Sequence, residues 1–118
     1  SADYRIGEEG TFNIGLNQVL IGKTMHHAGI ELAKDRLTQP AFQRAVINGE
    51  LFSPEAAINA GFLDHVVAAH DLLQTAQAVA TQMKKINMRA HRNTKLKVRQ
   101  HLLEALDRAV ELDKTQLM

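Results

Sequence analysis

The chain has 118 residues, 45% of them hydrophobic, which is the composition of one folded domain at most rather than of a disordered segment. Its 14 basic and 13 acidic side chains give a formal charge of +1, so the overall charge favours neither nucleic acid nor a membrane. The absence of cysteine excludes disulfides and thiolate chemistry and fits a cytoplasmic location. No apolar run approaches the roughly 20 residues needed to cross a bilayer, so no membrane partner is expected.

The first part of the chain predicts short strands. Residues 4–7 and 11–14 each alternate apolar with polar side chains, and Glu8-Glu9-Gly10 between them supplies a turn. This pattern predicts a β-hairpin or two short, adjacent strands. An apolar run bracketed by Gly15 and Gly22 follows, and it predicts a short buried strand over residues 19–21.

Two helices are predicted next. The apolar residues of the segment 25–37 recur at helical spacing and predict a helix. Thr38-Gln39-Pro40 ends this helix and starts a second one, because proline fits a first helical turn. Asn48-Gly49 ends the second helix, since both residues tolerate the left-handed conformation.

A third helix is predicted from its start and stop signals. Ser53 caps free N–H groups, and the proline and glutamate that follow it suit a first helical turn. Gly61 closes this helix. Residues 62–67 then predict a strand.

The last part of the chain is predicted to be helical. Asp71 and Gln74 resemble a capping box and start a long amphipathic helix over residues 72–86. A last helix is expected from Ala90 onward. Its predicted apolar face comprises Val98, Leu102, Ala105, Ala109 and Leu112.

Two segments carry a resemblance to a known family. Residues 15–22 (GLNQVLIG) and the strand pattern before them are similar to the segment of the enoyl-CoA hydratase/isomerase (crotonase) family with the pattern G-L-x-E-V-x-x-G. Residues 53–67 (SPEAAINAGFLDHVV) resemble the family signature s-a-e-e-A-x-x-x-G-l-v-d-x-V. The order and separation of the two segments, with the helices that follow, extend the resemblance over nearly the whole chain.

The resemblance implies an α/β fold, namely the C-terminal portion of the ClpP-like spiral of ββα units, with a few short strands and then a predominantly helical region. A single partial domain is expected, in which residues 1–67 end the spiral core and residues 68–118 form the helical oligomerisation region. Such helices imply a homotrimer or a hexamer. The missing N-terminal half of the same protein is a further expected partner, because Ser1 begins a stretch typical of a domain interior; a processed N-terminus is the alternative.

The resemblance also implies a function, the binding of acyl-coenzyme A thioesters in fatty-acid or related metabolism. In the family, two backbone N–H groups stabilise the enolate oxygen, and one or two carboxylates move protons. No cofactor is implied beyond the coenzyme A of the substrate. The N–H groups and the first glutamate belong to segments that precede this chain, so the fragment by itself is expected to be inactive.

The second family glutamate corresponds to Gln18, the catalytic candidate that the chain itself contains. An amide has no titratable proton near neutral pH, so Gln18 can orient water or substrate but cannot act as a general acid or base. Three interpretations follow: an enzyme with other chemistry, an enzyme whose acid lies in the missing half, or a non-catalytic relative that serves as an oligomerisation or binding module. Gln18 as a plain polar residue that closes a turn is the remaining interpretation.

Residues shortly after the glutamine are candidates for contact with the substrate. In the family, this loop and the following helix start border the acyl pocket, so Leu20, Met25 and His26 are expected to contact the acyl tail. The adjacent histidines and Glu31 also suggest a metal site. Only His27 and Glu31 share a helical face and no third ligand is near, so no metal is predicted.

The concentrated positive charge of the chain lies between residues 84 and 99. Arg92, Lys95 and Arg99 recur at spacings of three and four residues and share one helix face. A solvated face opposite the apolar stripe is one interpretation. Contact with the phosphates of coenzyme A, which the resemblance implies for basic side chains of these helices, is the sharper one. Nucleic-acid binding is disfavoured, because aromatic side chains are not interleaved with the basic ones.

Overall fold

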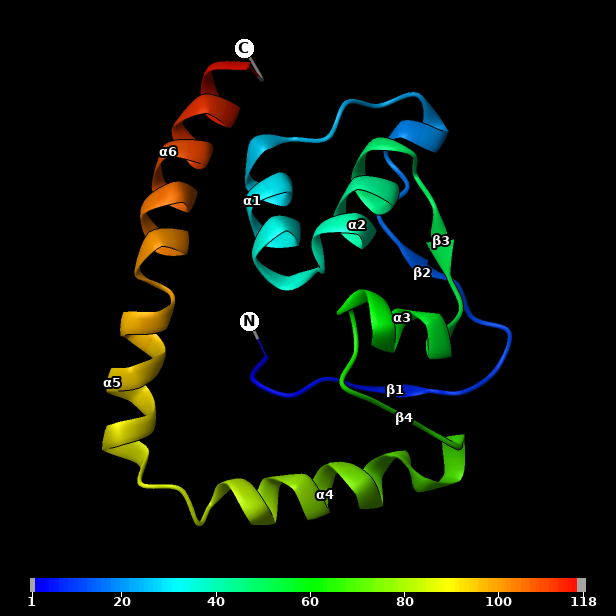
Figure 1. Cartoon of the computed structure of the whole chain (residues 1–118), viewed down its shortest axis with the longest axis vertical. Coiled ribbons are helices and arrows are strands. Elements are labelled where there is room, and N and C mark those ends of the chain that lie inside the picture. Colours follow the sequence, from blue (N-terminus) through cyan, green and yellow to red (C-terminus); the bar gives the residue numbers. More distant parts are fainter. Residues whose placement is uncertain (1, 117–118) are drawn as a thin grey trace.

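Residues 2–116 are described by the computed structural model, and they form two parts that we call the body and the arm (Figure 1). The prediction that concerns Ser1 falls outside the described residues. The arm, residues 72–116, consists of α4 (Leu72–Met83), α5 (Met88–Val98) and α6 (Gln100–Gln116). The body, residues 2–71, consists of β1 (Ile6–Glu8), β2 (Ile14–Gly15), the 3₁₀ helix η1 (Val19–Ile21), α1 (His27–Arg36), α2 (Gln39–Phe42), the π-helix η2 (Gln43–Ile47), β3 (Leu51–Phe52), α3 (Pro54–Ala60), β4 (His65–Val67) and the 3₁₀ helix η3 (Ala69–Asp71).

The arm runs around the body and gives the chain an open shape. In Figure 1, α4 lies along the lower edge, α5 continues up the left side, and α6 lies beside α1. The Cα radius of gyration is 16.3 Å, whereas a compact domain of this length has about 13.5 Å. The accessible surface is 8407 Å², against about 6,400 Å² for a compact monomer of this mass. The chain therefore exposes surface that a compact domain of its size would bury.

The strands of the described residues pair in two separate sheets of two strands each. β1 pairs in parallel with β4, with Ile6 opposite His65, and β2 pairs antiparallel with β3. Of the two predictions for residues 4–14, the β-hairpin is wrong, because the strands lie in different sheets, whereas two short strands that follow each other along the chain are present. The expected turn instead continues the pairing of β1, since the N–H of Glu9 donates to the carbonyl of Val67 at 2.8 Å.

Residues 19–21 form the 3₁₀ helix η1 and not the predicted buried strand. The carbonyl of Gln18 accepts the N–H of Lys23 at 2.8 Å, which closes a tight turn around this segment. Gly22 follows with a φ of 78°, a left-handed conformation that glycine adopts without strain. The side chain of Leu20 is 59% exposed, so the prediction of burial was wrong as well.

Apolar spacing and local start and stop signals predicted the α-helices of the body correctly. α1 lies within the predicted segment 25–37, and α2 carries Pro40 in its first turn. At the start of α3, Oγ of Ser53 accepts a backbone N–H at 3.2 Å. Gly61 ends this helix with a φ of 104°, and a Cβ there would lie 2.8 Å from the carbonyl oxygen of Arg36. Glycine is therefore required at this position by both conformation and space.

The remaining elements of the body differ in how well they were predicted. η2 continues α2 and ends at Ile47 with Asn48 as its C-cap, and Gly49 follows with a φ of 66°, as the stop signal predicted. β4 falls inside the predicted strand over residues 62–67. β3 comprises only Leu51 and Phe52, too few residues for an alternating pattern, and was not predicted.

The start of the arm differs from its prediction. Asp71 makes no side-chain capping bond to α4, because its backbone is already helical, with φ of −99° and ψ of −7°. The capping box with Gln74 is therefore not formed. The helix predicted over residues 72–86 is present but ends at Met83.

The last predicted helix is two helices, α5 and α6, which are separated at Arg99. α5 begins before the predicted Ala90, because Oδ1 of Asn87 accepts the N–H of that alanine at 3.0 Å and caps the helix. The predicted apolar face is only partly buried. Ala109 is 3% exposed, whereas Val98 is 74% exposed.

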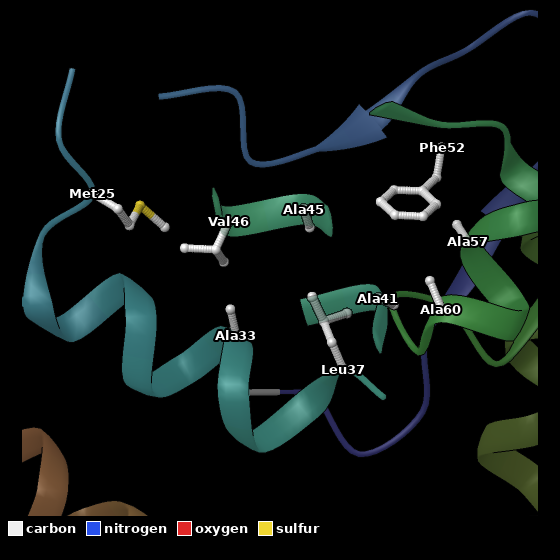
Figure 2. Packing of buried hydrophobic residues seen from close by; sticks show 9 residues of the cluster. All are labelled: Met25, Ala33, Leu37, Ala41, Ala45, Val46, Phe52, Ala57 and Ala60. Carbon is white, nitrogen blue, oxygen red and sulfur yellow. The ribbon is translucent and has the colours of Figure 1, made fainter. Parts of the chain in front are cut away.

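A hydrophobic cluster fills the centre of the body between α1, α2, η2 and α3 (Figure 2). Most of its members are alanines, so the helices approach one another closely. Within the arm, α4 and α5 contribute no buried residue, and the buried residue of the described part of α6 is Ala109. The core therefore belongs to the body. The cluster consists of Met25, Ala33, Leu37, Ala41, Ala45, Val46, Phe52, Ala57 and Ala60.

Candidate functional site

Gln18 lies immediately before η1, in the loop that follows β2. Its side chain is half-buried, and its Oε1 atom is buried without a hydrogen-bond partner among residues 2–116. A buried polar atom without a partner costs about 1–3 kcal/mol. Oε1 of Gln18 is therefore placed to accept a hydrogen bond from a water molecule or a ligand. The motif made Gln18 a candidate but gave no sign of this unpaired oxygen, and the catalytic role of the residue stays a prediction.

Leu20 lies in η1, close to Gly49. A Cβ added to Gly49 would be 2.7 Å from Cγ of Leu20 and 2.9 Å from Cγ2 of Val19, so glycine allows this close approach. Most of the Leu20 side chain is nevertheless exposed, two residues along the chain from Gln18. Contact of Leu20 with a substrate stays a prediction.

Met25 and His26, the other predicted substrate contacts, have structural partners. Met25 is 9% exposed, and Figure 2 shows its side chain directed toward Val46. Nδ1 of His26 accepts the N–H of Gly29 at 2.8 Å and caps α1. While this bond is formed, Nδ1 carries no proton, so the ring can donate only through Nε2. Contact of either residue with an acyl tail stays a prediction.

The other N–H groups at the start of α1 bind a residue that sequence reasoning missed, Asp113 of α6. Its carboxylate oxygens accept the N–H of His27 at 2.7 Å and of Ala28 at 3.0 Å. The hydrogen bond from Ala28 is the largest cause that lowers the pKa of Asp113 below its ordinary value. Because these N–H groups are occupied, the α1 N-terminus does not offer a site for an anionic ligand. The sequence gives no signal of this contact, whose partners lie 86 residues apart.

The basic residues predicted to bind coenzyme A phosphates lie close to the N-terminal segment. Lys95 and Arg99 form ion pairs with Asp3 at 2.7 and 3.2 Å, and Nε2 of His91 lies 3.3 Å from the same carboxylate. These contacts, with the hydrogen bond from Lys95 as the largest cause, lower the pKa of Asp3 to about 2. Arg92 is exposed and does not take part in this cluster of ion pairs.

An open hollow of about 640 Å³ lies between α4, α5, the start of α6 and the N-terminal segment. Its walls combine apolar side chains, among them Met88 and Leu103, with the basic side chains of Arg92, Lys95 and Arg99. The three predicted basic residues are thus brought together around one hollow. None of the other predicted site residues lines it in the described part of the chain. Its volume is within the range of small-molecule sites, about 300–1,000 Å³.

Two further features concern metals and membranes. Among residues 2–116, no group of three or more His, Cys, Asp or Glu side chains is arranged to hold a metal ion. His26 and His27, the adjacent histidines of the suggested metal site, use Nδ1 and the backbone N–H respectively for contacts at the start of α1.

No helix in the described ranges is long and apolar enough to span a bilayer.

The short strands, the turn that carries Gln18 and the encircling helical arm agree with a known class of protein. The sequence profile of the enoyl-CoA hydratase/isomerase family matches residues 1–118. The chain belongs to this family, and the resemblance found in its two motifs is confirmed. The predicted architecture, a few short strands followed by a helical region, is that of part of the crotonase fold.

Solved structures agree with this assignment. An enoyl-CoA hydratase/isomerase family protein from Pseudomonas syringae is 62% identical, with a TM-score of 0.96, and the match covers 99% of this chain and 51% of that chain. An enoyl-CoA hydratase from Mycobacterium ulcerans is 32% identical, with a TM-score of 0.92 and coverage of 99% and 51%. The human mitochondrial Δ3-Δ2-enoyl-CoA isomerase is 27% identical, with a TM-score of 0.88 and coverage of 98% and 45%. The chain therefore spans about half the length of these relatives. Comparison with proteins of curated function gave no match.

Proposed function

We propose that the full-length protein binds acyl-CoA thioesters and acts as an enoyl-CoA hydratase or isomerase in fatty-acid or related metabolism. The observation that carries this proposal is the family match over residues 1–118. We assign Gln18, in the turn before η1, to the family's second glutamate position. The unpaired Oε1 atom of this residue supports a role in binding water or substrate. No cofactor is proposed besides the coenzyme A of the substrate.

The chemistry proposed for Gln18 is orientation rather than proton transfer. When water adds to a double bond conjugated with a thioester, negative charge develops on the thioester oxygen and needs N–H donors. Oε1 of Gln18 accepts a hydrogen bond from the water or the substrate, but an amide cannot take up its proton. We assign the proton transfer and the oxyanion donors to the part of the full-length protein that this chain does not span.

Arg92, Lys95 and Arg99 are proposed to bind the phosphates of coenzyme A. All three line the same hollow, which supports a common ligand. Lys95 and Arg99 share the carboxylate of Asp3, so part of their charge is already neutralised. We expect Arg92, which is absent from that cluster of ion pairs, to contribute most to the attraction of a phosphate.

The arm is proposed to form subunit contacts in a homotrimer or hexamer, in the cytoplasm. We assign part of the surplus accessible surface over a compact monomer to contacts with other subunits, and the rest to the part of the full-length protein that this chain does not span. Leu73 and Val98 are 71% and 74% exposed, as expected of apolar side chains that another subunit buries in the assembly. The absence of cysteine supports the location.

The alternative function is a non-catalytic oligomerisation or binding module. The amide at the second glutamate position favours it, because a carboxylate that moves protons is replaced by a group that cannot. The exposed apolar side chains of the arm agree with such a module. The unpaired oxygen of Gln18 does not support it, because an oligomerisation module requires no hydrogen-bond acceptor there.

Assay of the full-length protein separates the two functions. Hydration of 2-enoyl-CoA and isomerisation of 3-enoyl-CoA thioesters are followed by the absorbance of the conjugated double bond. An enzyme is expected to turn over at least one substrate, and Gln18→Glu is expected to raise hydration by about 100-fold or more, since a general acid or base contributes about 10²–10⁴-fold. Asn17→Asp is the matched control, because it adds the same charge at the exposed neighbouring position. A wild type and a Gln18→Glu variant that are both inactive, yet still assembled, would establish the non-catalytic module.

A further inference from the structure

The end of α6 contacts the start of α1, next to the residues expected to border the acyl pocket (Figure 1). Asp113 accepts two backbone hydrogen bonds there, from His27 at 2.7 Å and from Ala28 at 3.0 Å. One helical turn earlier, Ala109 is 3% exposed, the value of a side chain packed in an interface. α6 is therefore attached to α1 by both packing and hydrogen bonds.

These bonds complete the hydrogen bonding of the first turn of α1. An α-helix leaves the N–H groups of its first turn without partners in the helix. Here His27 and Ala28 donate to Asp113, and Gly29 donates to Nδ1 of His26 at 2.8 Å. Two of the three N–H groups thus donate to a residue of the arm. Asp113 lies 86 positions after His27 and 85 positions after Ala28.

The first turn of α1 also fixes the side chains of Met25 and His26, because no free space remains at Gly29. A Cβ added to Gly29 would lie 2.5 Å from Cε1 of His26 and 2.7 Å from Cε of Met25. Both side chains therefore rest directly on the backbone of this turn. A displacement of the turn relative to the body must move them.

We propose that Asp113 is a positioning residue for the acyl pocket, which holds Met25 and His26 in place through the first turn of α1 and so couples the arm to recognition of the acyl chain. This proposal rests on the proposed acyl-CoA function. Asp113 acts through His27 and Ala28 and does not contact the substrate. A carboxylate suits this role, because its two oxygens accept both N–H groups and its charge is favourable at a helix N-terminus.

Kinetics of the full-length protein test this role. Asp113→Asn keeps one oxygen acceptor but sets an NH₂ group against the second N–H. We expect KM for long-chain enoyl-CoA to rise about 3- to 10-fold, while kcat and the KM for a four-carbon enoyl-CoA stay within about twofold. Asp113→Glu, which retains both oxygens and the charge, is expected to recover much of the loss. Asp107→Asn, an exposed acid on the same helix, is the control and is expected to change nothing.

Nuclear magnetic resonance of the same variants reads the positioning directly and does not depend on turnover. Asp113→Asn is expected to speed hydrogen exchange of the His27 and Ala28 amides and to shift the methyl resonance of Met25, whereas Asp107→Asn does neither. A wild type without any acyl-CoA activity overturns the proposed function and the coupling to acyl-chain recognition that rests on it, while the resonance measurements still decide whether Asp113 positions Met25. The role of Asp113 is overturned if Asp113→Asn changes neither the hydrogen exchange of the His27 and Ala28 amides nor the methyl resonance of Met25. It is also overturned if this variant changes KM equally for every acyl-chain length.

Discussion

The body and the arm are stabilised by different interactions. The body buries a hydrophobic cluster drawn from residues 25–60, whereas in the described part of the arm only Ala109 is buried. Among residues 2–116, the side-chain hydrogen bonds and ion pairs that join the two parts involve either Asp3 or Asp113. Apolar packing therefore determines the body, whereas the arm is held by the contact of α6 with α1 around Ala109 and by a few charged groups.

The largest expected effect is the loss of an aromatic ring from the body. Phe52 is 4% exposed and packs against Phe62 with ring centroids 5.5 Å apart. Phe52→Ala is expected to lower the free energy of unfolding by about 3–5 kcal/mol, because it removes buried apolar surface and leaves a cavity. Leu103→Ala in the arm, where the side chain is 47% exposed, is expected to cost about 1 kcal/mol or less. Urea denaturation measures both; equal losses would contradict the difference between body and arm.

An intermediate effect is expected for the ion pairs of Asp3. Its pKa is lowered from the ordinary value of 3.8 to about 2, so these contacts stabilise the folded state fully above pH 3.8 and lose their effect as the pH falls through about 2. Lys95→Met removes the largest cause and is expected to raise the pKa toward 3.8. The titration of the Asp3 carboxyl carbon by nuclear magnetic resonance measures this shift.

Lys97→Met is the control for the Asp3 titration, because Lys97 is exposed on the same helix and makes no ion pair with Asp3. It is expected to leave the pKa of Asp3 near 2. If the two lysine variants give the same titration, the contact between arm and N-terminal segment does not depend on Lys95.

The smallest effect on stability is expected for the exposed apolar side chains of the arm. Val98→Ser is expected to change the free energy of unfolding of the unassembled chain by no more than about 0.5 kcal/mol, since Val98 is 74% exposed. It is expected to weaken assembly of the full-length protein, as measured by sedimentation velocity. Ile47→Ser, at a body position that is 60% exposed, is the control. Unchanged assembly in Val98→Ser would remove this residue from the proposed subunit contact.

Features that are decided within a few residues were predictable from the sequence. Ser53 and Gly61 satisfy backbone groups of their own helix ends, and Pro40 needs only a first helical turn. The motif around Gln18 was equally local, and the family that it indicated is confirmed, whereas the catalytic role of Gln18 stays a prediction. Such signals act through backbone geometry that neighbouring residues already define.

Features that depend on distant partners were not predictable. Alternation correctly indicated that Ile6 is in a strand, but the pairing of β1 with β4 depends on residues more than 50 positions away. Asp3 and Asp113 are single acidic residues without a distinguishing pattern, and their partners lie 85 to 96 positions away. The unpaired oxygen of Gln18 likewise depends on what the fold places around it, which the motif does not specify.

The open shape of the chain has a thermodynamic consequence. The heat-capacity change of unfolding scales with the apolar surface that becomes exposed, and compact domains show about 12–15 cal/mol/K per residue. A chain that already exposes 8407 Å² when folded has less surface left to expose, so its heat-capacity change is smaller and its stability varies less with temperature. Any polypeptide that covers the arm increases the heat-capacity change of unfolding. The curvature of the free energy of unfolding plotted against temperature therefore indicates how much of the arm's surface is covered by other polypeptide.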